Sequence, residues 1–414
     1  MEETTQLVHH VLLLLVLILT FGIISGKIAN KLKLPDVVLF LIAGLILGQG
    51  LHWIIEPSRS FTNQFILTLG ATLILFDGGR LIRMETLKKV WLSVVMLSIP
   101  GVFITTAVVA YAVVAFFDLP WIYAILLASI IASTDPATLI PVFKQIRIKH
   151  KVKETVESES AFNDATASIL TFSVLAVALG TQSFSLGHAV VDFLKVSIGG
   201  ILVGLVIGIA ISYLVAHSKL GFFKDYTTIF MVVAAVAPYL IGDLLHVSGF
   251  MATFVAGLVW GNTYLFGFHM EEKQDEMNHF IDNMTLKMRM MIFILLGSQV
   301  DLLAISKYLW SGLLVILVFM FIARPLTVYL CTLPDRKAEW TQKERLFMCW
   351  VRETGVIPAA LSGMVTGMGV PHADIIASVT FLAILITILL QASTTAFVAR
   401  KLGVEENQAA GKIG

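Results

Sequence analysis

The chain has 414 residues, of which 57% are hydrophobic and only 14% are charged. Soluble domains carry about 25% charged residues, so this composition excludes a soluble protein and leaves no room for a sizeable domain outside a membrane. The formal net charge of +1 identifies no partner by itself. We predict an all-α, polytopic membrane protein that spans the lipid bilayer as one domain, 1–414, and we expect no nucleic acid to bind.

Thirteen apolar segments have roughly the length that a bilayer requires. In chain order they cover residues 8–30, 34–50, 63–81, 90–117, 120–145, 157–180, 188–215, 226–245, 248–266, 287–304, 307–331, 345–367 and 373–399. The second and the tenth are short, so twelve crossings are the alternative. A short polar tail, 403–414, follows the last segment.

Lysine and arginine are distributed unevenly over the connections between these segments. Connections on one side are nearly bare, whereas the other side collects 24 of the 29 basic residues. Basic connections stay in the cytoplasm. We therefore predict an odd number of crossings in a plasma (inner) membrane, with the N-terminus outside and the C-terminus in the cytoplasm.

A weak internal repeat links the second and the ninth segments. Residues 43–48 read AGLILG and residues 256–261 read AGLVWG. Seven segments separate the copies, an odd number, so they point in opposite directions, as in the inverted repeats of transporters. The alternative is that both stretches only supply small residues for helix packing.

The fifth and the twelfth segments, also seven apart, are the most interrupted ones. Pro136 and Pro141 prevent a regular helix through 132–141, and Pro358 lies among three glycines in 345–367. Backbone freed at membrane depth must be buried in protein or line a polar cavity. We predict two discontinuous helices that cross; a simple kink is the alternative for each proline.

Two carboxylates lie inside apolar segments, where an ionisable group is costly and marks a functional site by default. Asp164 lies about 10 Å along the helix predicted for 157–180, and Asp135 lies in the middle of 120–145. A short basic connection joins the two segments, so the acids have similar depths. We predict a buried cation site at this pair; the alternative for each acid is a structural role.

Neighbouring side chains add oxygen atoms to this site. Ser160 and Asp164 are four residues apart and share a helix face, with Asn163 beside them. Carboxylate, hydroxyl and amide oxygens suit a hard cation, and no Cys/His cluster is present for a soft metal. Asp164 would hold either a proton or a cation, and this competition is sufficient for obligatory exchange.

Further charges lie within or near the apolar segments. Arg324 lies about seven residues from the end of 307–331, and Glu159 is its predicted ion-pair partner, with a structural role. Arg352 is expected to pair with a nearby acid. Three roles are open for Asp77: a partner of Arg352, a group in the inner ion path, or an ordinary acid at a helix end.

No enzyme motif is present: the sequence lacks a nucleophile elbow, a phosphate-binding loop and a metalloprotease motif. We expect neither enzymatic activity nor a cofactor. The histidines fall almost wholly in predicted loops or at helix ends, so no pH sensor is assigned to them.

Four motifs together resemble the monovalent cation:proton antiporter superfamily, on its NhaP/NHE-like branch. They are 134–136 (TDP), 159–164 (ESAFND), 75–79 (LFDGG) and 323–325 (ARP). The resemblance covers nearly the whole chain. It implies a thirteen-helix fold with an ion-translocating core at about 90–180 and 307–399, and a homodimer formed through scaffold helices at about 8–81 and 188–304.

The resemblance also implies the roles of individual residues. Asp164, Asp135, Ser160 and the Thr134 backbone would hold Na⁺, and the core would move as in an elevator. The chain departs from the family at one point, because Arg352 is followed by Glu353 where the family often has glycine. We expect no long regulatory tail of the kind that many relatives have.

The expected activity is exchange of Na⁺, or Li⁺, for H⁺ across the plasma membrane. Asn163 cannot take a proton, so Asp164 alone would titrate and exchange would be one for one and electroneutral, as the resemblance also implies. A second proton on Asp135 would change that ratio. The alternatives are a K⁺/H⁺ antiporter of the same fold and, from another class, a gated cation channel or a transport-dead membrane sensor.

Overall fold

The computed structural model describes residues 2–32, 34–135, 146, 148–181, 186–216, 223, 225–267 and 274–405. In these residues the regular structure is helical, with one isolated antiparallel bridge between Ile148 and Glu405. Pro136, Pro141 and most of the predicted tail lie outside the described residues. The prediction of an all-α protein is confirmed for the described part.

Helix is present in each of the thirteen predicted ranges. The elements are α1 (Glu2–Leu32), α2 (Asp36–Leu45), η1 (Ile46–Gly50), α3 (Phe61–Leu81), α4 (Met84–Ser98), α5 (Pro100–Phe117), α6 (Trp121–Ile131), α8 (His150–Ala178), α9 (Leu186–Ala216), α10 (Thr227–Leu244), α11 (Gly249–Gly261), η4 (Thr263–Phe266), α12 (Gln274–Gln299), α13 (Leu302–Val318), η6 (Phe319–Ala323), α14 (Arg324–Thr332), α15 (Gln342–Trp350), α16 (Val356–Gly367), α17 (Ala373–Thr387), η7 (Ile388–Ala392) and α18 (Ser393–Leu402). Seven of the described helices are long and apolar enough to cross a membrane by length and composition. The number of crossings stays a prediction.

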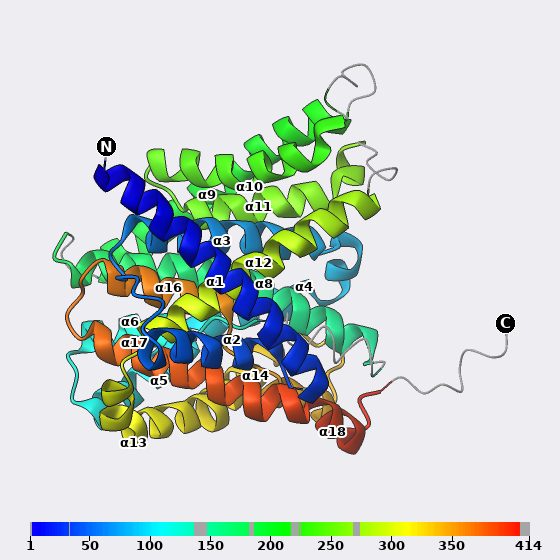
Figure 1. Ribbon diagram of the computed structural model, residues 1–414. Coiled ribbons are helices and arrows are strands. Elements are labelled where there is room, and N and C mark those ends of the chain that lie inside the picture. Colours follow the sequence, from blue (N-terminus) through cyan, green and yellow to red (C-terminus); the bar gives the residue numbers. More distant parts are fainter. Residues whose placement is uncertain are drawn as a thin grey trace.

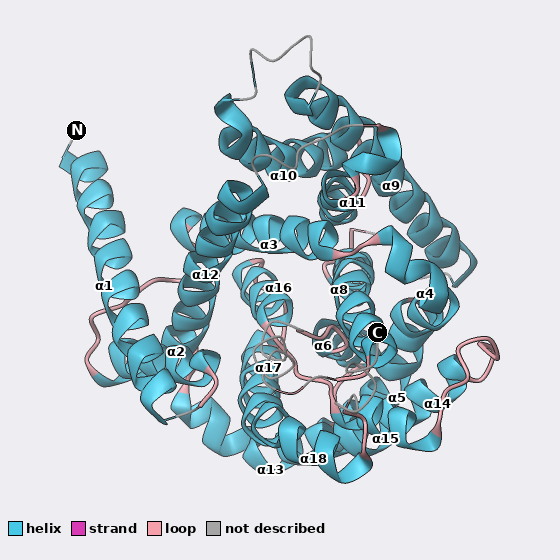
Figure 2. Cartoon of the chain, turned by 90° about the vertical axis from the view of Figure 1, so that its right-hand side faces the viewer, coloured by secondary structure: helices cyan, strands magenta, loops and turns pink. Residues whose placement is uncertain are grey.

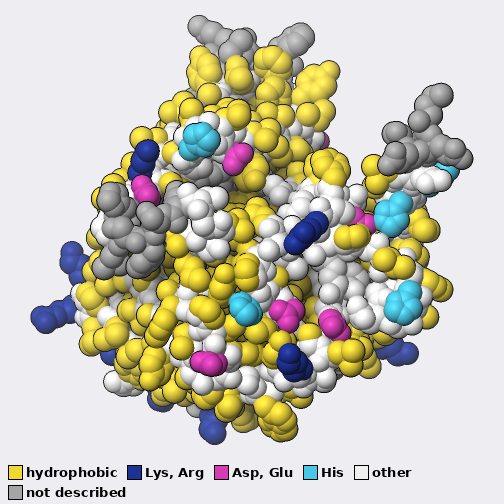
Figure 3. Space-filling model, turned by 90° about the vertical axis from the view of Figure 1, so that its left-hand side faces the viewer, with side chains coloured by type: hydrophobic (Ala, Val, Ile, Leu, Met, Phe, Trp, Pro, Cys, Tyr) yellow, Lys and Arg dark blue, Asp and Glu magenta, His cyan; other side chains and the backbone are white. Residues whose placement is uncertain are grey.

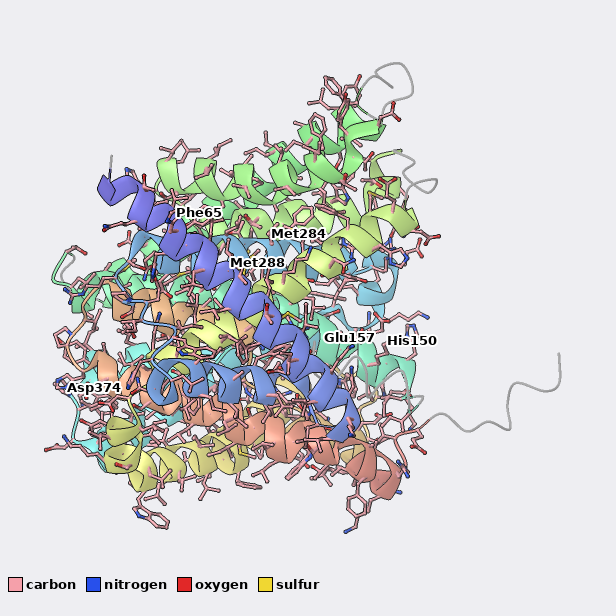
Figure 4. The ribbon with its side chains drawn as sticks, in the orientation of Figure 1. Phe65, His150, Glu157, Met284, Met288 and Asp374 are labelled. Atoms are coloured by element: carbon pink, nitrogen blue, oxygen red, sulfur yellow. The ribbon has the colours of Figure 1, made fainter. Side chains whose placement is uncertain are left out.

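The helices run between two opposite faces of the molecule. Helix α1 begins at the left of Figure 1 and α18 ends at the right, and we call these the N-terminal and C-terminal faces. Figure 4 shows Asp374 near the first face and His150 near the second. Figure 3 shows the N-terminal face, where acidic and histidine side chains lie among many apolar ones.

Several helices have basic residues in their last turn at the C-terminal face. The last turns contain Lys31 in α1, Arg80 in α3, and Arg400 and Lys401 in α18. Viewed from this face, α6, α8 and α16 lie in the middle of the molecule and the other helices surround them (Figure 2). In this view other helices surround the elements that contain or adjoin Asp135, Ser160 and Asp164, whereas α3 with Asp77 and α14 with Arg324 belong to the surrounding helices.

Some predicted boundaries differ from the observed ones. The segment predicted at 90–117 is two helices, because α4 ends at Ser98 and α5 begins at Pro100, where a proline fits a first turn. Helix α12 begins at Gln274, well before the predicted 287. Its first turns are amphipathic, and Met277 and Ile281 are buried at 5% and 0% exposure.

The repeated glycine stretches pack helices closely. A Cβ atom on Gly44 of α2 would lie 2.2 Å from the Ile294 carbonyl oxygen of α12, and one on Gly257 of α11 would lie 2.0 Å from the Phe76 carbonyl oxygen of α3. The small-residue packing is thus observed for both copies. The packing partners are also related by the repeat. Helices α2 and α11 contain the two copies and lie seven predicted segments apart, and their partners α12 and α3 lie seven predicted segments apart as well.

Two adjacent glycines of α3 provide a matched test of this packing. A Cβ on Gly79 would lie 2.1 Å from the Phe254 carbonyl oxygen, whereas one on Gly78 would meet only the Ala161 Cβ, at 3.6 Å. Gly79→Ala should destabilise the protein by about 1–3 kcal/mol through overpacking. Gly78→Ala should be neutral or stabilising. Thermal unfolding in detergent measures both, and equal losses would contradict the close packing of α3 on α11.

Candidate functional site

Two stretches of unwound chain meet at the centre of the molecule. Helix α6 ends at Ile131, and the chain through Asp135 is not helical; residues 351–355 separate α15 from α16. The Asp135 amide donates to the Glu353 carbonyl oxygen at 2.9 Å, and the Val356 amide donates to Asp135 Oδ2 at 3.3 Å. The two interrupted segments therefore meet as predicted, and the continuation of the first one beyond Asp135 lies outside the described residues.

Residue types on the second stretch allow this contact. A Cβ on Gly355 would lie only 1.9 Å from the Asp135 Cβ, so only glycine permits the two chains to approach so closely. Pro358 is the third residue of α16, where the amide that proline lacks would have no helical partner. Gly355 and Pro358 thus allow α16 to begin next to Asp135.

Helix α8 holds the first unwound stretch through two polar side chains. Ser160 Oγ donates to the Thr134 carbonyl oxygen at 2.7 Å. Asn163 Nδ2 donates to Thr134 Oγ1 at 2.8 Å, and the Thr134 amide donates to Asn163 Oδ1 at 3.2 Å. The Asn163 amide group therefore brackets Thr134, so three of the predicted site residues lie together.

Both predicted carboxylates are buried at this place. Asp164 is 7% exposed and Asp135 is 5% exposed. Asp164 Oδ1 accepts a hydrogen bond from Ser133 Oγ, a residue that the sequence analysis did not assign to the site. The only sequence signal for Ser133 is its position directly before Thr134 and Asp135, because its contact with α8 is a tertiary one.

A buried ion pair lies beside the crossing. Glu159 and Arg324 are each 1% exposed. Arg324 Nη1 and Nη2 donate to the two carboxylate oxygens of Glu159, the second at 3.0 Å, and Arg324 Nε donates to the Met348 carbonyl oxygen at 2.9 Å. The structure brings these predicted partners together in a bidentate geometry, which is the strong form of this interaction.

The reading that pairs Asp77 with Arg352 is wrong. Asp77 Oδ1 accepts from Arg80 Nε at 3.0 Å and from Arg80 Nη2 at 2.7 Å, because an arginine three residues along α3 is within easy reach. Arg352 Nη2 donates to the Ala132 carbonyl oxygen, and its guanidinium lies 5.1 Å from the ring centroid of Phe319. Arg352 thus binds the end of α6 rather than the acid we expected.

A small cavity lies at the crossing, with a volume of about 10 Å³, which is room for about one water-sized particle. Its lining is rich in oxygen atoms and charged groups: Thr134, Asp135, Val156, Glu159, Ser160, Arg324, Val351, Arg352 and Glu353. Asp164 lies one helical turn beyond Ser160 on α8. Carboxylate, hydroxyl and carbonyl oxygens of this kind suit an alkali cation.

The family model described as "Sodium/hydrogen exchanger, transmembrane" matches residues 15–401 of the chain. The chain belongs to the sodium/hydrogen exchanger family. The resemblance inferred from the four motifs is confirmed. In this exchanger the TDP motif lies in the unwound stretch after α6, and the ESAFND motif lies on α8, which binds that stretch.

Relatives support the same assignment. The exchanger is 32% identical to Na(+)/H(+) antiporter 1 of Methanocaldococcus jannaschii, a match that covers 93% of this chain and 94% of the relative. The solved structure of the sodium proton antiporter MjNhaP1 from that organism superposes with a TM-score of 0.84 at 30% identity, covering 98% of this chain and 100% of that one. A K(+)/H(+) antiporter NhaP2 of Shewanella is 28% identical, covering 94% of this chain and 66% of that protein.

The buried ion pair gives a prediction for stability. Removing either Glu159 or Arg324 leaves an unpaired buried charge, which typically costs about 3–5 kcal/mol. Glu159→Ala and Arg324→Ala should each lower the thermal stability in detergent, and the double variant should recover part of the loss. Strictly additive losses in this double-mutant cycle would show that the two side chains do not interact.

Proposed function

We propose that the chain is a secondary active antiporter that exchanges Na⁺, and Li⁺, for H⁺ across the plasma membrane. The observation that carries this proposal is the pair of buried acids, Asp135 and Asp164, at the crossing of two unwound helices. Membership of the sodium/hydrogen exchanger family supports it, as do relatives named Na(+)/H(+) antiporter.

Exchange follows from the charge of the site. The proposed ligands are the carboxylates of Asp164 and Asp135, the Ser160 hydroxyl and the Thr134 carbonyl oxygen. Asp164 offers one negative charge and binds one cation or one proton. In formal charge Asp135 is offset by Arg352 of the same cavity lining, so a cation and a proton bound together would leave one positive charge uncompensated in a buried place, which is costly. The two ions therefore displace each other, and neither crosses the membrane alone.

Movement of the site would complete the cycle. In the proposed elevator mechanism the core, about 90–180 and 307–399, slides against a scaffold at about 8–81 and 188–304. The scaffold would also form the homodimer. Basic residues at the C-terminal face favour a cytoplasmic location for that face, with the N-terminus outside.

The proposed stoichiometry is one proton for one cation. Asn163 cannot titrate, Glu159 is neutralised by Arg324, and Asp135 is assigned as a ligand at the helix break that keeps its charge, so Asp164 is the single carboxylate that changes its proton. The moving core then has the same net charge in both directions. Exchange is therefore electroneutral in this proposal.

A second candidate is a K⁺/H⁺ antiporter, because relatives with that name also match the chain. Oxygen ligands alone do not distinguish the two ions. Flux into proteoliposomes distinguishes them: a pH-dequenching assay with Na⁺, Li⁺ and K⁺ should respond to Na⁺ and Li⁺. A response to K⁺ alone would favour the second candidate. Saturable exchange that couples the two ions would exclude a channel.

Asp164→Asn tests the shared carboxylate. The amide keeps the size of the side chain but has no charge to exchange, so Na⁺-driven proton flux in proteoliposomes should vanish while expression and thermal stability persist. Asp118→Asn is the matched control, since Asp118 is exposed and left-handed at the end of α5, a conformation that asparagine tolerates. Normal flux in Asp164→Asn would remove the exchange site from this residue.

Voltage tests the stoichiometry. In liposomes clamped with K⁺ and valinomycin, the Na⁺ gradient that balances a given pH gradient should not change with the imposed voltage. One-for-one exchange moves no net charge, so voltage does no work on the cycle. A balance point that shifts with voltage would rule out this ratio and make Asp135 the first candidate for a second proton carrier.

A further inference from the structure

Glu353 is a buried carboxylate that the mechanism above does not use. Its exposed fraction is 0%, and within the described part of the chain neither of its carboxylate oxygens has a hydrogen-bond partner. Buried acids are normally paired or hydrogen-bonded, because an isolated buried charge is very costly. The contact of the Glu353 carbonyl oxygen with the Asp135 amide involves only the main chain and does not require this side chain.

The position of Glu353 shows which partner would satisfy it. Glu353 lines the small cavity at the crossing together with Thr134, Asp135 and Ser160. An unpartnered, fully buried carboxylate and three residues of the proposed cation site thus border one space, whose volume suits a single small ion.

The charges around the cavity support a cation as that partner. Besides Glu353, the charged residues in the lining are Asp135, Glu159, Arg324 and Arg352, whose formal charges cancel. Glu159 is bound by Arg324, and the hydrogen bond of Arg352 goes to a carbonyl oxygen, so Asp135 is the lining acid that offsets Arg352 in formal charge. A cation that enters this balanced set has no counter-charge of its own in the lining, and Glu353 adds that charge.

We propose that Glu353 is an additional direct ligand of the transported monovalent cation, with its carboxylate turned to the cavity at the crossing. This inference rests on the proposed antiport function and deepens it. The Glu353 carboxylate would give the cation site of this chain one further ligand and one further negative charge.

The test compares three variants of the full-length protein in detergent. Glu353→Gln removes the charge at constant size, and Glu353→Asp keeps it. Glu344→Gln is the matched control, because Glu344 is also buried, at 3% exposure, but forms ion pairs with Lys149 at 3.3 Å and Lys151 at 3.0 Å. Thermal unfolding is followed against NaCl, with choline chloride keeping the ionic strength constant.

A ligand and a structural acid predict opposite results. For a ligand, Glu353→Gln should unfold at the wild-type temperature or above it in choline chloride, because an unpaired buried charge is gone. The Na⁺ concentration for half-maximal stabilisation should rise about tenfold or more, as expected for the loss of a charged contact. Glu353→Asp should restore part of the affinity. Glu344→Gln should lower the unfolding temperature without moving the Na⁺ midpoint.

Transport separates this inference from the proposed function. In proteoliposomes, Glu353→Gln should raise KM for Na⁺ by a similar factor. An unchanged midpoint and KM, with or without a lower unfolding temperature, would overturn the ligand role and leave antiport by the wild type intact. A wild type that shows neither cation-dependent stabilisation nor exchange would overturn the proposed function itself.

Discussion

Unwound backbone in the interior of a membrane protein is the constraint on which the rest of the structure depends. Amides and carbonyls that leave a helix at that depth find no water, so they must bind within the protein. Here the amide of Asp135 binds the carbonyl oxygen of Glu353, and Ser160 and Asn163 bind Thr134. The backbone of the two unwound stretches is thereby hydrogen-bonded to each other or to side chains of α8. As a result, several oxygen atoms lie close to Asp135 and Asp164.

The surrounding helices make this arrangement tolerable. Glycines allow α11 to approach α3, and α2 to approach α12, at backbone distance, so rigid helices flank the crossing. The ion pair of Glu159 with Arg324 neutralises two buried charges next to the site. Since those two charges are satisfied by each other, the acids at the crossing stay available for a cation or a proton.

The sequence was sufficient to predict the broken helices and the buried acids. Proline and glycine at membrane depth have few explanations. An aspartate at that depth also has few, as Asp135 and Asp164 illustrate. Glu159 and Arg324 were also predictable partners, because each needs an opposite charge at a similar depth. Depth and charge can be read along one chain without knowledge of its tertiary contacts.

Contacts between elements could not be predicted in the same way. The contact of Ser133 with Asp164 depends on how α8 meets the chain after α6, whereas Asp77 pairs with Arg80 three residues along its own helix, a partner that helical spacing offered. The histidines gave a further example, since His10 lies within α1 and its Nε2 is 2.5 Å from a carboxylate oxygen of buried Glu56. Direction and rotation of side chains decide these contacts, and neither is encoded in a hydropathy pattern.

The most direct test of the account is to locate the cation. Thallium, an electron-rich monovalent ion, can be bound to the purified protein and located by its anomalous scattering in crystals. One peak is expected at the crossing, within coordination distance of Asp135, Asp164 or both, and next to the Thr134 carbonyl oxygen. A peak elsewhere, or none in protein that exchanges thallium for protons, would contradict it.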